Sequence, residues 1–367
     1  MLNPELYYTL YLTVVTIYTI LLSKRYNALP DSRLSGKFVS PNLSSILLTG
    51  IMVLFIGLRP RHRVFVDMSN YNTSFEVLRG QAFEWDFDRT NRVFDNFMYY
   101  MATNGYNITI FFFIMAAIYF IGIYVSSRKL FPKDTFYAII IYLAAFSTFS
   151  YATNGIKAGA AAAIFLCAIA YHNNKMICSG LLLLSIGFHH SMIMPVVAFA
   201  LCYFYRNPKI YLIGWAVSLL IALAHITYFQ NLLGSMADES GAGYLTMEGV
   251  NEYALYITGF RLDFVFYSFF PIASGYYAIF KCGYKSKFYD WIYCTYLLSN
   301  AVWMLCMYAS FTNRIAYLSW LMLPVVLVYP FFDKEFVKNQ YKKLNVVAWA
   351  HLGFTIMMQV VYYGFIK

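Results

Sequence analysis

The sequence predicts an all-α protein that crosses a membrane many times. Of its 367 residues, 60% are hydrophobic and 12% are charged, and the mean hydropathy is +0.56; soluble domains carry about 25% charged residues. The longest polar interruptions, 59–106 and 230–262, are too short for an independent catalytic domain of about 100 residues. We therefore expect one integral membrane domain over 1–367, with its chemistry in the helix bundle and its loops.

Twelve apolar runs predict roughly twelve transmembrane helices. A helix needs about 20 residues to cross a hydrocarbon core of about 30 Å, and two of the runs are short by that measure. The runs cover residues 6–23, 43–58, 107–127, 135–150, 155–171, 176–188, 191–205, 210–229, 263–280, 288–309, 315–332 and 345–364. The 35 tyrosines suggest amphipathic rings at the membrane surfaces and along a polar-walled cavity.

Successive connections between these runs lie on alternate sides of the membrane, and the two sets of connections differ in charge. One side holds 17 of the 27 basic residues and five of the 17 acidic residues, a balance of +12, and the other side has a balance of −2. Because basic loops stay on the cytoplasmic side of a membrane, both termini and the loops of about 59–106 and 230–262 are expected outside. The excess charge then reflects orientation and contact with anionic lipid, and no nucleic acid partner is expected.

The external loop 59–106 opens with a basic cluster. The cluster consists of Arg59, Arg61 and Arg63. Basic residues are disfavoured on the external side, so a basic cluster there is unusual. It indicates that the guanidinium groups bind an anionic ligand. The structural alternative is that the six arginines of this loop pair with its own acidic residues.

The same loop contains the motif Glu84-Trp85-Asp86-Phe87-Asp88 and then a helical pattern. The motif has the D-x-D form that holds a metal in soluble sugar transferases, but the loop faces away from the cytoplasmic nucleotide pool, and we expect no metal here. From Val93 to Met101 apolar residues recur with helical spacing, which predicts an interfacial helix. This helix would either shield a lipid-borne substrate or plug the bundle.

Lys157 lies at the outer end of a predicted helix, between Gly155 and Gly159. Glycines at this spacing permit close contact between helices, and they leave room around the ammonium group. An ionisable residue at this depth in a membrane indicates a functional site, so we predict that Lys157 has a functional role. The structural alternative is a lysine that extends to the membrane surface.

His189 and His190 interrupt the apolar sequence between two short runs. A break at membrane depth is tolerated where it lines a polar cavity, and an unperturbed imidazole, with a pKa of about 6.5, can accept a proton near neutral pH. Adjacent residues on a helix point about 100° apart, so only one of the two would readily face a substrate. The structural alternative is that neighbouring carbonyl groups bind both rings.

Two further basic residues open predicted helices from the outside. Arg314 follows Asn313 at the start of one run, in a placement like that of Lys157, and Arg261 precedes another run. For Arg261, an ion pair with Asp263 is the structural alternative.

In order along the chain, these motifs resemble the EpsG family of exopolysaccharide polymerases, which are related in role to the Wzy O-antigen polymerases. The matching segments are Gly57-Leu58-Arg59 with Asp67 and Tyr71, Asn154-Gly155-Ile156-Lys157-Ala158-Gly159-Ala160, Phe188-His189-His190-Ser191, and Asn313-Arg314-Ile315. The resemblance implies a multi-pass protein of the bacterial inner membrane that joins undecaprenyl-pyrophosphate-linked repeat units on the periplasmic face, without metal, nucleotide or other cofactor. We expect a GT-C-like bundle whose periplasmic loops form the site.

This chemistry assigns a role to each candidate residue. The pyrophosphate leaving group departs as an anion and needs cations rather than a general acid, whereas the acceptor hydroxyl needs a general base. The candidate bases are His189, His190 and Asp67, and the resemblance favours His189, because Phe188-His189-His190-Ser191 matches the F-H-x-S spacing of the family. The candidate substrate-binding residues are Arg59, Arg61, Arg63, Tyr71, Lys157, Arg261 and Arg314.

Partners and alternatives follow from the same reading. The expected partners are the lipid-linked oligosaccharide and membrane lipid, with a chain-length regulator and a flippase as candidate protein partners. Two other functional classes stay open. A flippase or transporter would move the lipid-linked sugar without forming a bond, and a glycosyltransferase that uses a polyprenyl-phosphate sugar would rely on Asp86 and Asp88.

The charge asymmetry predicts that the loop 59–106 faces the outside of the cell. A cysteine introduced beside Asn91 should therefore react with a membrane-impermeant maleimide in intact spheroplasts. Labelling that requires prior permeabilisation of the membrane would reverse the orientation and remove the basis for an external site.

Overall fold

Helices make up the regular structure of the chain. The computed structural model describes residues 2–29, 42–235, 259–309 and 312–360. Within these ranges the elements are α-helices with short 3-10 and π-helical turns. The predicted all-α class is thus confirmed for the described residues. Most of the predicted external loop 230–262 falls at 236–258, outside the described residues.

The chain forms two compact units. The first contains residues 1–193 and 331–367, and the second contains residues 194–330. The last helix of the chain therefore returns to the unit that the N-terminal helices build. A single membrane domain over 1–367 stays a prediction.

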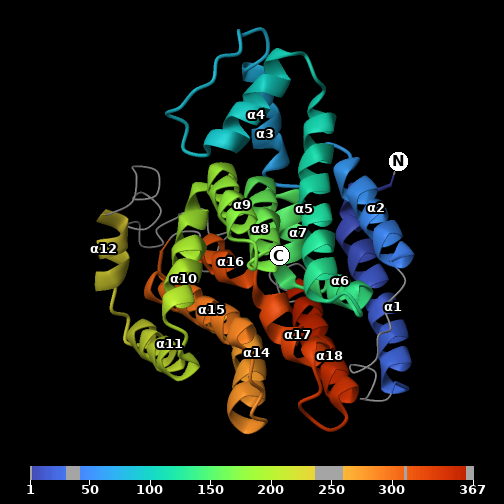
Figure 1. Ribbon diagram of the computed structural model, residues 1–367. Helices are drawn as coiled ribbons and strands as arrows, with labels where there is room; N and C mark the ends of the chain where they lie inside the picture. The colour runs from blue at the N-terminus through green and yellow to red at the C-terminus, as the bar shows by residue number, and fades with distance from the viewer. Residues whose placement is uncertain (1, 30–41, 236–258, 310–311, 361–367) are drawn as a thin grey trace. The chain divides into compact units, whose positions relative to one another are not determined.

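The first unit joins the N-terminal helices to the last helix, and α8 packs between α5 and α9 within it (Figure 1). Its helices are η1 (Pro4–Leu6), α1 (Tyr7–Asn27), α2 (Leu43–Gly57), α3 (Met68–Val77), α4 (Arg92–Thr103), α5 (Ile108–Leu130), α6 (Thr135–Leu143), α7 (Phe146–Thr153), α8 (Ile156–Ala170), α9 (Lys175–Phe188), η3 (His190–Met192) and α18 (Gln340–Gln359). α1 lies beside α18.

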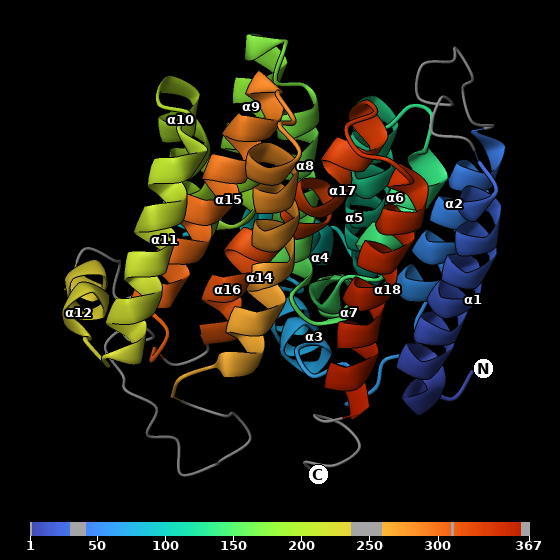
Figure 2. The same ribbon diagram turned by 90° about the horizontal axis from the view of Figure 1, so that it is seen from below.

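The second unit is built around α15, which lies along α11 (Figure 2). Its helices are α10 (Ile193–Phe204), α11 (Pro208–Leu223), α12 (Tyr228–Ser235), α14 (Leu262–Tyr276), the π-helical η4 (Tyr277–Lys281), α15 (Lys287–Leu305), α16 (Thr312–Trp320) and α17 (Leu323–Asp333). Trp303 and Trp320 are fully buried in its core.

By length and composition, three helical stretches of the described residues can each cross a bilayer, namely Pro4–Asn27, Ile108–Leu130 and Thr312–Asp333. A fourth candidate is the pair of α6 and α7, which is bent by 78°. The sequence predicted one span over 135–150, whereas the chain bends after Leu143. Five more apolar helices in the described part have 10–17 residues. A polytopic membrane protein is thus supported, and twelve spans stay a prediction.

Small residues let the helices around α8 approach closely. A Cβ atom at Gly159 would overlap the backbone oxygen of Tyr151 in α7, and one at Gly122 would lie 2.8 Å from the Cβ of Ala163. A larger residue at either position would push the helices apart. The predicted close contact at Gly159 is therefore confirmed.

Many buried tyrosines donate hydrogen bonds to backbone carbonyl groups within one unit. The Tyr11 hydroxyl donates to the Leu143 oxygen at 2.5 Å in the first unit, and the Tyr296 hydroxyl donates to the Ser268 oxygen at 3.0 Å in the second. A buried phenol requires such a partner. Part of the tyrosine content that the sequence analysis assigned to surfaces and a cavity therefore belongs to the helix core.

Candidate functional site

In the first unit, α3 and α4 of the loop 59–106 lie over one end of α8 and α9 (Figure 1). α4 is the helix predicted over Val93 to Met101, and its buried residues include Phe94 and Met98. The contact with α9 is close, because a Cβ atom at Gly187 would lie 2.6 Å from Cγ2 of Val93. Glycine at position 187 therefore allows α4 to reach α9.

The predicted break at the two histidines is confirmed. α9 ends at Phe188, His189 has an extended backbone, and a 3-10 turn begins at His190. The His190 backbone N–H donates to Oδ1 of Asn91, just before α4, at 3.1 Å. His189 is half-buried and His190 is exposed. The start of α4 thus fixes the backbone between the two rings.

Lys157 lies in the first turn of α8, next to the same contact. Its Nζ is 5.6 Å from the centre of the Phe94 ring, within the range of a cation–π interaction. The positive end of a helix dipole repels an ammonium group and attracts an anion. An anion bound here would be stabilised by the ammonium group and by the helix end together.

Arg59 is buried, and it acts within the protein fold. Its exposed fraction is 3%, and its guanidinium donates to the Ile56 oxygen at 2.8 Å and to the Thr153 oxygen at 3.0 Å. The Phe65 and Phe112 rings lie 5.4 Å and 5.1 Å from its Cζ. Arg59 therefore ties the end of α2 to the end of α7, four residues before Lys157.

The charge of Arg59 survives this burial. Burial lowers the pKa of the Arg59 guanidinium to about 10, so the group is still protonated at neutral pH. Within the described residues, no carboxylate forms a salt bridge with Arg59, and its buried Nε has no hydrogen-bond partner. An uncompensated buried charge is costly. Arg59 therefore contributes a buried positive charge between the ends of α2 and α7.

Of the other arginines of the loop, two form ion pairs with acidic residues of the loop, and two more are exposed without such a pair among the described residues. Arg79 pairs with Glu76 at 2.7 Å and Arg89 pairs with Asp86 at 3.2 Å, as the structural alternative proposed. Arg61 is exposed and donates to Oδ1 of Asn72 at 3.3 Å. Arg63 is exposed as well. The three arginines 59, 61 and 63 thus do not share one environment.

Asp67 and Tyr71 lie on α3, which packs against α4. Asp67 precedes the helix, is half-buried, and makes no side-chain capping bond. The ring of Tyr71 lies 5.9 Å from the ring of Phe94, centre to centre. α4 thereby links Tyr71 to Lys157 through Phe94.

The D-x-D motif is folded onto α4. Asp86 pairs with Arg89, and its backbone N–H donates to Oδ1 of the buried Asn96 at 2.9 Å. Among the described residues, no group of three or more histidine, cysteine or acidic side chains could hold a metal ion. In this part of the chain, Asp86 fixes the loop to the helix.

Arg261 and Arg314 belong to the second unit. Arg261 is buried, and its guanidinium pairs with Asp263 through contacts of 2.9 Å and 2.7 Å. Its Cζ lies 3.4 Å from the centre of the Phe264 ring, so Arg261 makes the ion pair that was its structural alternative. Arg314 is exposed, at the third position of α16.

Sequence reasoning missed three residues of this arrangement. Asn91 binds the histidine break, and Phe94 lies beside the Lys157 ammonium. The buried Oδ1 of Asn154 has no hydrogen-bond partner among the described residues. Asn154 lies in a motif that the sequence analysis quoted, three residues before Lys157. Phe94 belongs to the apolar pattern that predicted the helix over Val93 to Met101, but no local signal indicated its contact with Lys157, and none marked Asn91.

Comparison with known proteins identifies one family. A model described as the EpsG family matches residues 44–366 of this chain, which includes all four motif segments. Searches of curated proteins and of solved structures found no match.

The contacts of Arg59 predict that it stabilises the fold. Arg59→Ala should lower the free energy of unfolding by about 2 to 4 kcal/mol, because two carbonyl groups lose a charged donor. Arg59→Lys should lie between this variant and the wild type, since one ammonium cannot span both oxygens. The exposed Arg63→Ala should stay within about 0.5 kcal/mol of the wild type. Denaturant unfolding of the purified protein measures all three, and equal stability of the two alanine variants would contradict this role.

Proposed function

The chain belongs to the EpsG family, and we propose that it is a polysaccharide polymerase. In this proposal it joins undecaprenyl-pyrophosphate-linked oligosaccharide repeat units on the periplasmic face of the bacterial inner membrane, by glycosyl transfer without a metal. One observation carries the proposal beyond the family match. The start of α4 contacts both the histidine break and Lys157, through Asn91 and Phe94, so a candidate base and a candidate cation lie at one place.

The proposed reaction needs two kinds of group. The acceptor hydroxyl oxygen forms a bond with the anomeric carbon, and the bond from that carbon to the pyrophosphate oxygen breaks. The undecaprenyl pyrophosphate leaves with the electron pair, so positive charge stabilises it in the transition state. The proton of the hydroxyl passes to a general base.

Lys157 is the proposed pyrophosphate-binding cation. Its position in the first turn of α8 supports this role, because the helix end and the ammonium attract the same anion. Arg59 lies beyond the α7–α8 turn and adds positive charge without exposing its guanidinium. We assign Arg59 as a positioning residue.

His189 is the proposed general base. It directly follows α9 and has an extended backbone. The hydrogen bond from the next residue, His190, to Asn91 helps to hold this backbone in place. A neutral imidazole can accept the proton of the acceptor hydroxyl. Asp67 is the rival base, because a carboxylate can also accept the hydroxyl proton. His190 is exposed and is the third candidate.

Other parts of the proposal concern substrate contacts and architecture. Tyr71, Arg61 and Arg63 are proposed to contact substrate from the loop 59–106. Arg261 and Arg314 stay predictions for the second unit. Twelve spans in a GT-C-like bundle, with this loop on the periplasmic side, complete the proposed architecture, and the lipid-linked oligosaccharide is the proposed substrate.

A product assay tests the proposal. Purified protein given lipid-linked repeat units should yield a ladder of longer glycans, with chelator present and with no nucleotide sugar. Single added sugars would support a transferase that uses a polyprenyl-phosphate sugar, and unchanged lipid-linked units that cross the membrane would support a flippase. A strict requirement for a divalent metal would contradict the metal-independent mechanism. Asp86 and Asp88 would then be the candidate metal ligands.

Loss of the Lys157 charge is expected to slow polymerisation. Lys157→Ala should reduce the rate by about 30-fold to 1000-fold, because one charge-assisted contact in a partly dry site contributes about 2 to 4 kcal/mol. Lys157→Arg should retain much of the rate, since the charge survives. The exposed Lys175 at the start of α9 supplies the matched control Lys175→Ala. Wild-type turnover by a folded Lys157→Ala protein would exclude Lys157 from the site.

Removal of the imidazole tests the base. His189→Ala should reduce polymerisation by about 100-fold to 10,000-fold, the usual contribution of a positioned base, while binding of the lipid-linked substrate is retained. His190→Ala should have a smaller effect. If His189→Ala polymerises normally and Asp67→Asn is folded, binds substrate and is inactive, the base is Asp67 instead.

A further inference from the structure

A groove in the first unit runs between the end of α1 and the start of α18. Its volume is about 540 Å³. It is lined by Ser23 and Asn27 of α1 and by Lys342, Asn345, Val346 and Trp349 of α18. None of these residues belongs to the proposed polymerase site.

The floor of the groove is a polar network that is already in place. The Nδ2 of the buried Asn345 donates to the Ser23 oxygen at 3.0 Å and to Oδ1 of Asn27 at 2.8 Å. The Tyr137 hydroxyl donates to Oδ1 of Asn345 at 2.6 Å. Because Oδ1 of Asn27 is used within the network, the amide nitrogen of this exposed side chain is left as a donor for a ligand.

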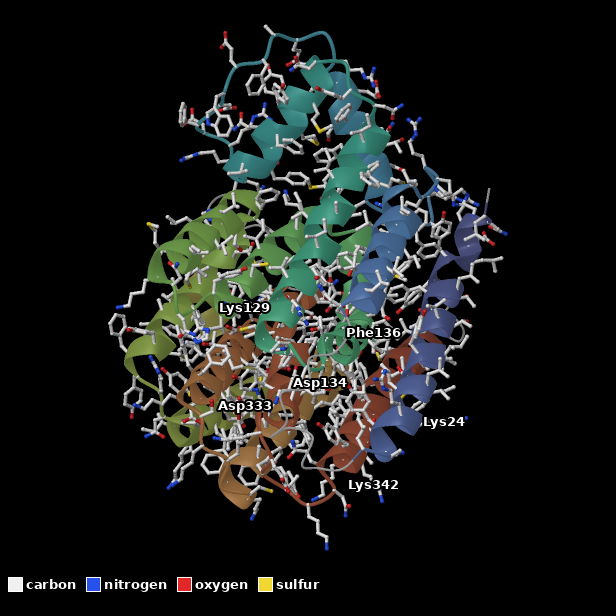
Figure 3. The ribbon with its side chains drawn as sticks, turned by 45° about the vertical axis from the view of Figure 1, so that its right-hand side comes forward. Lys24, Lys129, Asp134, Phe136, Asp333 and Lys342 are labelled. Carbon is white, nitrogen blue, oxygen red and sulfur yellow. The ribbon has the colours of Figure 1, made fainter. Side chains whose placement is uncertain are left out.

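Two lysines give this end of the groove a positive charge. Lys342 lines the groove, and Lys24 follows the lining residue Ser23; both side chains are exposed. Figure 3 shows Lys24 at the end of α1 and Lys342 at the start of α18. Neither forms a salt bridge within the described residues. Both lie in connections that the charge asymmetry places on the cytoplasmic side.

Apolar side chains continue along both helices beyond the polar end. Val346 is 69% exposed and Trp349 is 38% exposed on α18, and Ile20 is 39% exposed on α1, one turn from Ser23. The indole N–H of Trp349 donates to Oγ of Ser23 at 3.0 Å, which holds the ring across the groove. Tryptophan in this arrangement is typical of the boundary between lipid headgroups and acyl chains.

We propose that this groove binds an anionic phospholipid. The phosphate would lie at Lys342 and the Asn27 amide, with Lys24 beside it, and an acyl chain would lie along Trp349, Val346 and Ile20. Positive charge at one end and exposed apolar side chains at the other match a ligand that is itself amphiphilic. Anionic lipids are attracted to basic groups at the cytoplasmic surface. This proposal does not depend on the proposed polymerase activity.

Quenching of tryptophan fluorescence by lipid tests the proposal. The full chain is placed in nanodiscs of phosphatidylcholine that contain a rising fraction of phosphatidylglycerol with brominated acyl chains. Trp349 is one of six tryptophans, so the difference between wild type and Trp349→Phe isolates its signal. Brominated phosphatidylglycerol should quench this signal at a lower mole fraction than brominated phosphatidylcholine does. Each lysine near the surface contributes about fivefold to the affinity for anionic lipid. The double variant Lys24→Gln with Lys342→Gln should therefore raise the mole fraction of brominated phosphatidylglycerol at half-maximal quenching, the midpoint, by about 25-fold.

The control is Lys175→Gln, which removes an exposed lysine from the start of α9 and should leave the midpoint unchanged. Added inorganic phosphate should not displace the brominated lipid, because it lacks the acyl chain; displacement would mean a free anion site and overturn the proposal. Equal quenching by the two lipids, or an unchanged midpoint in the double variant, would mean non-specific lipid contact and would also overturn it.

Discussion

The contact of α4 with the ends of α8 and α9 is the constraint on which the candidate site depends. Val93 fits against Gly187, Asn91 binds the backbone of His190, and Phe94 lies beside the Lys157 ammonium. Each contact joins a loop helix to a residue that is distant in sequence. Without this docking, the histidine break and the lysine would lie on neighbouring helix ends with nothing between them to set their geometry.

Positive charge is the second feature of the site. Arg59 has a structural role, whereas Lys157 is the candidate for a chemical role. Arg59 remains protonated at neutral pH although it is buried, and carbonyl groups and aromatic rings surround it. Lys157 occupies the end of α8 where the helix dipole disfavours a cation. In the proposed function, this positive charge would attract the pyrophosphate leaving group.

Much of this arrangement could be predicted from local sequence. The helix near Val93, the close packing at Gly159, the break at His189 and the family itself are confirmed, because spacing, small residues and ordered motifs are local signals. The bond from His190 to Asn91 crosses 99 residues, and the carbonyl partner of Arg59 at Thr153 is as remote. Such pairings depend on tertiary packing, which local sequence does not specify. The 78° bend within the predicted span 135–150 was not predicted either. The sequence did not reveal that Arg59 is buried whereas Arg61 and Arg63 are exposed, because charge alone carries no information about burial.

A disulfide between α4 and α9 tests the central claim most directly. In the structure, a Cβ atom at Gly187 would lie 3.4 Å from the Cβ of Val93, close to the separation of about 3.5 to 4.5 Å in disulfides. The double variant Val93→Cys with Gly187→Cys should therefore cross-link under mild oxidation, as detected by mass spectrometry of the linked peptides, and the cross-linked protein should still lengthen glycans. The single variant Val93→Cys is the control. A failure to cross-link, or a cross-linked protein that polymerises only after reduction, would contradict the claim that docked α4 completes the site.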